Sequence, residues 1–168
     1  MSDGALAALT IALGLLDAGQ NHCSTGCFAP SDAQERLSVS IGKASIDGDS
    51  AGAEVYLRRT LGREFGPFGI AYGLSATEDG AFWAGIGPLY EIPIGEAFYA
   101  ELHLMPGIYV QGDGPDLGGP IEFRSGVEIG YEANGVRYGL SYDHRSNNEF
   151  YDINPGLESL QFRVSINR

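Results

Sequence analysis

Residues 121–146 read IEFRSGVEIGYEANGVRYGLSYDHRS, and this stretch decides the fold. From 121 to 131 every second position carries Ile, Phe, Ser, Val, Ile or Tyr, whereas the positions between carry Glu, Arg or Gly. Asn134-Gly135 interrupts the pattern, which then resumes. A period of two is typical of a β-strand with one apolar face. Because Asn-Gly between two such runs favours a tight turn, the stretch predicts a β-hairpin.

The same alternation extends over the chain from residue 37 onward, broken about every ten residues by Gly, Pro, Asn or Asp. No helical pattern interrupts it. An even number of antiparallel strands joined mostly by short turns predicts an all-β, eight-stranded antiparallel up-and-down β-barrel over residues 37–168. The expected strands are 37–46, 53–63, 67–77, 81–91, 96–110, 121–133, 135–146 and 157–167.

Two barrels fit this pattern, a soluble one with its apolar face inside and a membrane one with its apolar face toward lipid. The polar face mixes Gly and Ser with Glu and Arg, as a narrow lumen requires, and the chain has a single lysine, Lys43. Strands of about ten residues also suit a tilted membrane span. We therefore expect an outer-membrane type of barrel with Trp83 in an interface belt and His103 inside. Its predicted lumenal ion pairs join Arg124, Arg137, Arg145 and Arg163 to Glu101, Glu122, Glu128 and Glu132.

Composition limits the partners. A chain of 168 residues is long enough for one domain. Its net charge of −12 argues against nucleic acid, whose phosphates need basic clusters. Cys23 and Cys27 could close a small disulfide, or with His22 contribute to a metal site, but no second Cys/His pair follows. We expect neither a metal nor a cofactor, and the pairing of the two cysteines stays open.

Residues 1–36 lack the strand pattern and form an apolar, cysteine-containing segment ahead of the barrel. The run ALAALTIALGLL at 5–16 is too short to span a bilayer as a helix. It has the length of a signal-peptide core, yet no Lys or Arg precedes it. Three interpretations remain: a signal peptide cleaved after Ala18 or Gly19, a retained helix lying on the barrel or the membrane surface, and a remnant of a misplaced start site.

The last two strands carry the candidate chemistry. The apolar stripe of the seventh strand continues by steps of two into His144 and Ser146, and that of the eighth, read backwards, ends at Glu158. If Val136 pairs with Ile166, His144 lies opposite Glu158, with Cβ atoms about 4.5–5.5 Å apart. A carboxylate, an imidazole and a hydroxyl in this order suit a serine hydrolase. The alternative is a group of ordinary polar residues at the mouth of a hairpin.

These residues also resemble a known family. His144-Arg145-Ser146-Asn147, followed by Asn-Pro-Gly-Leu-Glu at 154–158, is similar to the signature of the lipid A 3-O-deacylases, outer-membrane acyl hydrolases also labelled acyloxyacyl hydrolase-like. The segment LGGPIEFRSG at 117–126 is similar to the strand that approaches the site in that family. The resemblance covers about residues 37–168.

The resemblance implies a serine esterase in the bacterial outer membrane that removes the ester-linked 3-position acyl chain from lipid A, the lipid part of lipopolysaccharide. Ser146 would be the nucleophile, His144 the general base and Glu158 its partner, with Asn147 at a position implicated in the oxyanion hole. One departure concerns Asn148 and Glu149, which stand where better-known members have small residues, including a glycine.

That departure keeps two other functions open. One is a catalytically inactive outer-membrane barrel with a structural or partner-binding role, and the other is a soluble lipid-binding barrel. The sequence also leaves open whether the barrel acts alone, as a homodimer or in a larger membrane assembly.

Overall fold

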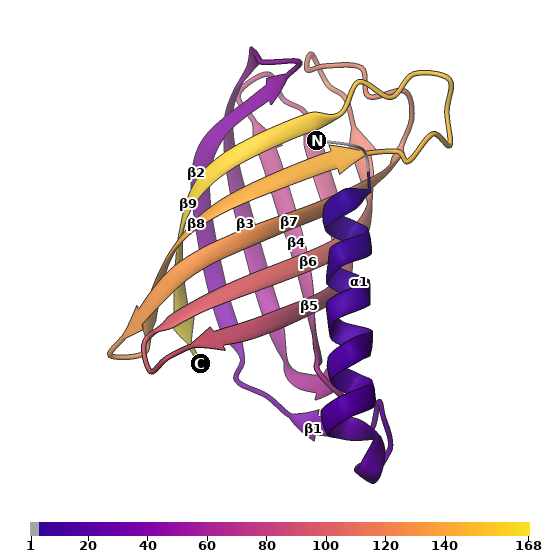
Figure 1. Ribbon diagram of the computed structural model, residues 1–168. Coiled ribbons are helices and arrows are strands. Elements are labelled where there is room, and N and C mark those ends of the chain that lie inside the picture. The colour runs from indigo at the N-terminus through magenta and orange to yellow at the C-terminus, as the bar shows by residue number, and fades with distance from the viewer. Residues whose placement is uncertain (1–3) are drawn as a thin grey trace.

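The computed structural model describes residues 4–168, so the first three residues of the predicted N-terminal segment lie outside it. Eight strands form a closed barrel in which each pairs antiparallel with its neighbour in sequence, and β2 pairs with β9 to close the ring (Figure 1). The predicted eight-stranded up-and-down barrel is confirmed. Its strands are β2 Arg36–Ile46, β3 Asp49–Phe65, β4 Phe68–Thr77, β5 Phe82–Ile94, β6 Phe98–Val110, β7 Ile121–Ala133, β8 Val136–Ser146 and β9 Leu157–Asn167.

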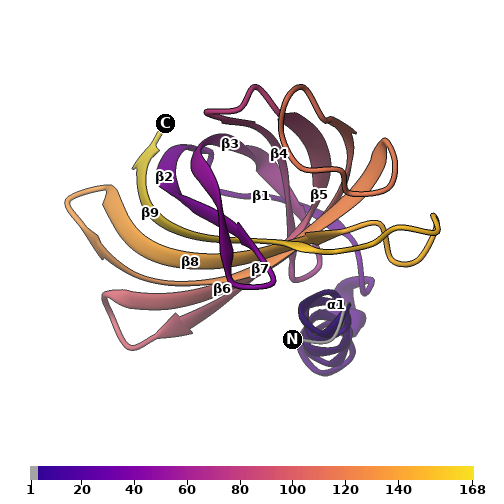
Figure 2. The same ribbon diagram turned by 90° about the horizontal axis from the view of Figure 1, so that it is seen from above.

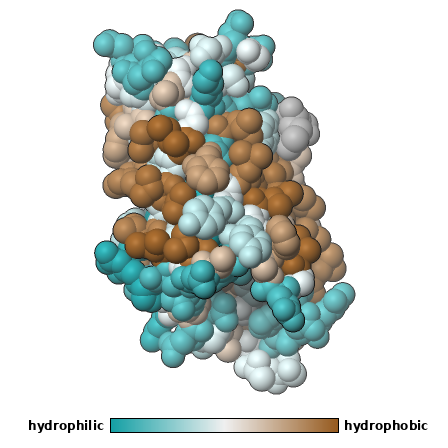
Figure 3. Space-filling model, turned by 90° about the vertical axis from the view of Figure 1, so that its left-hand side faces the viewer, coloured by the Kyte–Doolittle hydropathy of each residue, from teal (hydrophilic) through white to brown (hydrophobic). Residues whose placement is uncertain are grey.

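The apolar stripes face outward. Side chains such as Ile129, Leu140 and Phe162 are exposed by half or more, although their neighbours in the chain are buried. On the face shown in Figure 3, hydrophobic side chains form a band between hydrophilic top and bottom ends. Such a surface suits lipid and not water. The soluble barrel with its apolar stripes inside is therefore wrong.

Ion pairs fill the lumen, and two of them join predicted partners, whereas among residues 4–168 the predicted Glu122 has no ion pair. Arg163 pairs with Glu128, and Arg137 pairs with Glu132 at 2.5 Å between Nε and Oε2. Arg124 pairs with Glu54, whose Oε1 lies 3.0 Å from its Nη1. Glu54 also accepts from the two polar side chains Arg145 and Gln161. The pairs of Glu54, and that of Arg58 with Glu101, were not among those predicted, because the predicted lumenal set left out β3.

Trp83 corrects the prediction of an interface belt. It is fully buried inside the barrel, and its indole Nε1 donates to the carbonyl of Glu122 at 3.3 Å. Two glycines give it room, Gly85 on the same strand and Gly107 on β6, because a Cβ on either would approach the indole within 2.6 Å. His103 is lumenal as predicted, with its Nε2 3.6 Å from Oδ1 of Asp143.

The two ends of the barrel differ. One end, here called the turn end, has the short connections 66–67, 95–97 and 134–135. The other, here called the loop end, carries the long connections 111–120 and 147–156. Short turns on the periplasmic side and longer loops outside are the pattern of outer-membrane barrels. The loop end, where β8 finishes and β9 begins, is therefore the outward end.

The helix α1, Ala5–Asp17, lies outside the ring of strands against β5, β6 and β7 (Figure 2). It runs from the loop end toward the turn end (Figure 1). Gly14 permits close contact with β4, because a Cβ there would meet the ring of Phe68 at 2.1 Å. Within residues 4–168, no helix combines the length and the hydropathy needed to cross a membrane.

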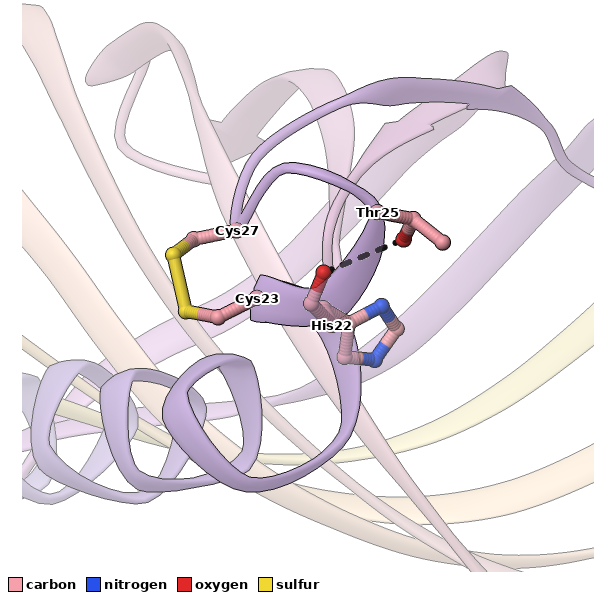
Figure 4. Close-up of a disulfide and its surroundings, with 4 residues drawn as sticks. All are labelled: His22, Cys23, Thr25 and Cys27. Carbon is pink, nitrogen blue, oxygen red and sulfur yellow. Dashed lines mark hydrogen bonds between the residues drawn. A yellow bond between two sulfur atoms is a disulfide. The ribbon is translucent and has the colours of Figure 1, made fainter.

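A short connection leads from α1 into the barrel. It contains the helical turns η1 Ala18–His22 and η2 Cys23–Thr25, and the strand β1 Pro30–Asp32, which pairs with β3 and was not predicted. Cys23 and Cys27 form a disulfide with an S–S distance of 2.02 Å (Figure 4). Beside it, the Thr25 hydroxyl donates to the carbonyl of His22 at 3.1 Å. The sequence left open a disulfide or a metal site for the two cysteines. The structure contains the disulfide.

Candidate active site

The structure pairs β8 with β9 in the predicted register. Val136 lies opposite Ile166, and His144 lies opposite Glu158. Ser146 follows two residues after His144 and therefore shares its face of the strand. His144 and Ser146 are 7% and 5% exposed, and Glu158 is half-buried. The three residues predicted from sequence thus lie at the loop end of a single hairpin, with His144 directly opposite Glu158.

The neighbouring strand completes the surroundings of the hairpin. On β7, Phe123 lies opposite Ser146 and Ser125 lies opposite His144. The ring of Phe123 packs edge-on against that of Phe150, with centroids 5.5 Å apart. Ser146 therefore lies beside an aromatic pair on the outer surface of the barrel, next to the lipid-facing belt.

Loop 147–156 folds back over the imidazole. Gly156 has a φ of +71°, and a Cβ at this position would come within 2.9 Å of Cε1 of His144. Only glycine combines this left-handed backbone with so close an approach. His144 and Glu158 also line a cavity of about 340 Å³ with Asp47, Gly48, Asn154, Pro155 and Gly156.

Asn147 ties two loops together. Its Nδ2 donates to the carbonyls of Leu117, at 2.7 Å, and Ile153, at 2.6 Å, and its own N–H donates to Oδ1 of Asn154 at 3.1 Å. Its side chain is fully buried. The predicted oxyanion role of Asn147 stays a prediction. The contacts observed here hold loop 147–156 against loop 111–120.

Asn148 and Glu149, the departure from the family pattern, both have left-handed backbones, with φ of 53° and 62°. Both side chains are exposed. Asn tolerates this conformation, but for Glu it is strained. A glycine at position 149 would adopt the same backbone without that cost.

Three further residues belong to the site and were not predicted to have a role in it. Tyr142 lies one pair away from Glu158 on the same face of the hairpin, and Asn154 and Gly156 line the cavity of His144. Tyr142 precedes His144 by two residues on the same stripe, and that spacing was the available signal. No spacing in the sequence indicates that loop 147–156 folds against the strands. Among residues 4–168, no group of three or more His, Cys, Asp or Glu side chains could hold a metal ion.

Comparison with known proteins identifies the family. A family model described as lipid A 3-O-deacylase (PagL) matches residues 70–167, more than half of the chain. The crystal structure of the outer membrane enzyme PagL is similar, with a TM-score of 0.62 and 21% identity over 78% of this chain and 98% of that one. No curated protein sequence matches.

Two other solved barrels share the fold. Neisserial surface protein A has a TM-score of 0.58 and 12% identity, over 83% of this chain and 99% of its own. A designed transmembrane β-barrel has a TM-score of 0.56 and 8% identity, over 82% of this chain and 98% of its own. The family match, together with the outward apolar belt, places the chain in the bacterial outer membrane. The chain belongs to the lipid A 3-O-deacylase (PagL) family of outer-membrane β-barrels.

Proposed function

We propose that this protein is a serine esterase that removes the ester-linked acyl chain from the 3-position of lipid A. The observation that carries the proposal is the pairing of His144 with Glu158, with Ser146 two residues further along the same face. Family membership supports the substrate class. The site lies at the loop end, the end that faces outward in barrels of this kind.

The proposed reaction has two steps. The Ser146 hydroxyl attacks the ester carbonyl while His144 takes its proton, and Glu158 stabilises the imidazolium that forms. The ester C–O bond then breaks, the proton passes from His144 to the leaving alkoxide, and the acyl chain is held on Ser146. In the second step His144 activates a water molecule, which releases the acyl chain as a fatty acid and restores Ser146.

The position of the site suits a substrate that stays in the membrane. Below His144 on the outer face, Leu140 and Leu160 are 58% and 55% exposed. Within loop 147–156, Phe150 and Ile153 are also more than half exposed. An acyl chain solvated by the bilayer could reach Ser146 along this apolar surface, while its sugar stays among the polar groups at the loop end.

Asn147 is proposed to support the developing oxyanion through its position at the start of loop 147–156. Its side-chain NH2 group already serves two carbonyls. Asn154 brings a second carboxamide to the cavity of His144, held in place by the N–H of Asn147. We therefore propose that Asn147 acts on the oxyanion through the loop that it braces, with Asn154 fixed in the cavity of His144.

The test is acyl loss from lipid A. The purified barrel in detergent is incubated with lipid A, and the products are weighed by mass spectrometry beside Ser146→Ala and Ser31→Ala. Ser31 is exposed on β1 at the turn end and serves as the matched control. Loss of one acyl chain with the native protein and Ser31→Ala, but not with Ser146→Ala, supports the proposal.

An inactive barrel is the second candidate, and the strained backbone at Glu149 favours it. If the folded native protein leaves several forms of lipid A intact, this candidate replaces the esterase. Folding is checked by the shift in electrophoretic mobility between unheated and boiled samples, which a closed barrel shows.

A further inference from the structure

Arg145 stands between His144 and Ser146 in the chain, but its side chain points the other way. Because successive side chains on a strand alternate between its two faces, His144 and Ser146 face outward and Arg145 faces the lumen. Its side chain is 3% exposed there. The proposed reaction makes no use of this cation, although a buried charge is costly unless its partners compensate for the lost water.

The guanidinium group of Arg145 reaches across the lumen. Its Nη2 donates to Oε1 of Glu54 on β3, at 2.5 Å, and to the hydroxyl of Ser75 on β4, at 3.1 Å. Its central carbon lies 5.5 Å from the ring centroid of Trp83 on β5 and 5.8 Å from that of Tyr109 on β6, within the range of cation–π attraction. The neighbours of β8 in the sheet are β7 and β9. These contacts therefore join β8 to strands with which it shares no ladder.

Glu54 connects the three strands around the candidate site from the inside. Besides Arg145, this fully buried acid accepts from Arg124 on β7, at 3.0 Å, and from Gln161 on β9, at 2.6 Å. The outward faces of β7, β8 and β9 carry the candidate site and its surroundings. One carboxylate on β3 thus holds the lumenal faces of the same three strands.

The strand pairing ends at the proposed nucleophile. The last pair of β8 with β9 joins Arg145 to Leu157, and the last pair with β7 joins Ser146 to Phe123. The ends of strands open more readily than their centres. A side chain fixed across the lumen at position 145 limits rotation of the backbone there, and such a rotation would also turn the side chains of His144 and Ser146.

We propose that Arg145 is a positioning residue: its contacts across the lumen fix the strand between His144 and Ser146 and so hold the imidazole and the hydroxyl in their reactive arrangement. The inference rests on the proposed function, because it gives Arg145 a task in that reaction. A displacement of about 1 Å can cost about a hundredfold in rate. Loss of Arg145 should therefore lower kcat and leave substrate binding on the outer face nearly unchanged.

The first test compares two lumenal arginines of β8. Arg145→Met removes the anchor. Arg137→Met is the matched control, because Arg137 lies at the turn end of the same strand and pairs across the lumen with Glu91 on β5. In both variants the acid keeps a second arginine. Arg145→Met should lower kcat on lipid A about 10- to 100-fold with KM within about twofold of native, whereas Arg137→Met should keep native kcat.

Arg145→Lys tests the planar group. It keeps the charge but loses the fork of donors, so its kcat should lie between those of Arg145→Met and the native protein. The temperature at which the mobility shift is lost is measured for each variant, so that a general loss of stability is not taken for a displaced site. Native kcat with Arg145→Met, or an equal fall in kcat with Arg137→Met, would overturn the proposal.

A second measurement does not depend on activity. The chain has three histidines, so ¹³C-labelled histidine gives three ring signals in NMR spectra of the barrel in detergent, and His144→Gln identifies the signal of His144. This signal should move or broaden in Arg145→Met and stay native in Arg137→Met. It should also change in Arg145→Lys, and because lysine retains the charge, that change reports position.

These results would support the positioning of His144 by Arg145 even if the native protein hydrolyses no form of lipid A. A His144 signal that stays native in Arg145→Met, or that changes equally in Arg137→Met, would overturn it whatever the activity.

Discussion

His144 on β8 and Glu158 on β9 lie directly opposite each other, in the register that pairs Val136 with Ile166 at the other end of the hairpin. Tyr142 lies one pair further down on the same face, opposite Leu160. The strand pairing alone therefore brings the acid to the base, and the loop between the strands is left to shape the cavity around them.

Removing the negative charge of Glu158 should weaken His144 as the general base. Glu158→Gln keeps the shape but takes away the partner of the imidazolium, so kcat on lipid A should fall about 10²- to 10⁴-fold. Glu96→Gln, which changes an exposed acid at the turn end, should have native kcat. A rate for Glu158→Gln within about twofold of native would show that Glu158 is not part of the machinery.

Gly156→Ala should displace the imidazole. The new methyl group would meet Cε1 of His144 and strain the backbone, so activity should fall at least about tenfold. Gly80→Ala is the matched control, because Gly80 also has a positive φ, of 79°, but an added Cβ would have nothing within 4 Å. Both variants should lose similar stability in urea unfolding, and only Gly156→Ala should lose activity. Equal activities would contradict the contact.

Asn147→Ala should loosen both long loops at the loop end. It leaves the buried carbonyls of Leu117 and Ile153 without their donor, which costs about 1–3 kcal/mol. Limited proteolysis should therefore cut within 147–156 faster than in the native protein, and kcat should fall. Lower kcat with native resistance to protease would show that Asn147 acts at the oxyanion and not as a brace.

Glu149→Gly should stabilise the protein. The φ of 62° costs Glu about 1 kcal/mol, a cost that glycine avoids. Glu149→Ala retains a Cβ and should give little gain. Urea unfolding of the three proteins measures the difference, and a Glu149→Gly barrel less stable than native would contradict the strain.

Glu54→Gln should destabilise the barrel more than any of these changes. Glu54 is fully buried and accepts from Arg124 and Arg145, so the substitution leaves two buried guanidinium groups with a neutral neighbour. Breaking a buried pair in this way costs about 3–5 kcal/mol. The temperature at which the mobility shift is lost should fall clearly, and an unchanged temperature would show that the lumenal network is redundant.

The sequence predicted the strands and the register of the last hairpin because both depend on a period of two. Once Val136 was paired with Ile166, the position of Glu158 followed by counting. The lumenal role of Glu54 and Arg58 was less visible, because Arg59 interrupts the outward stripe of β3 and pairs instead with Glu35 on the outside.

Other features depend on contacts between segments distant in sequence. Trp83 is next to another aromatic, Phe82, and what places it in the lumen is the space left by Gly85 on its own strand and Gly107 on β6. The position of α1 on the barrel depends on the close approach of Gly14 to the ring of Phe68 on β4. No local pattern carries such information.

The most direct test of the Ser146–His144–Glu158 machinery is covalent trapping of the nucleophile. The folded barrel is treated with a long-chain alkyl fluorophosphonate, and the modified residue is located by mass spectrometry in the native protein and in His144→Ala. The account predicts one adduct, on Ser146, that is lost in His144→Ala. A native barrel that stays unlabelled, an adduct elsewhere, or undiminished labelling in His144→Ala would contradict it.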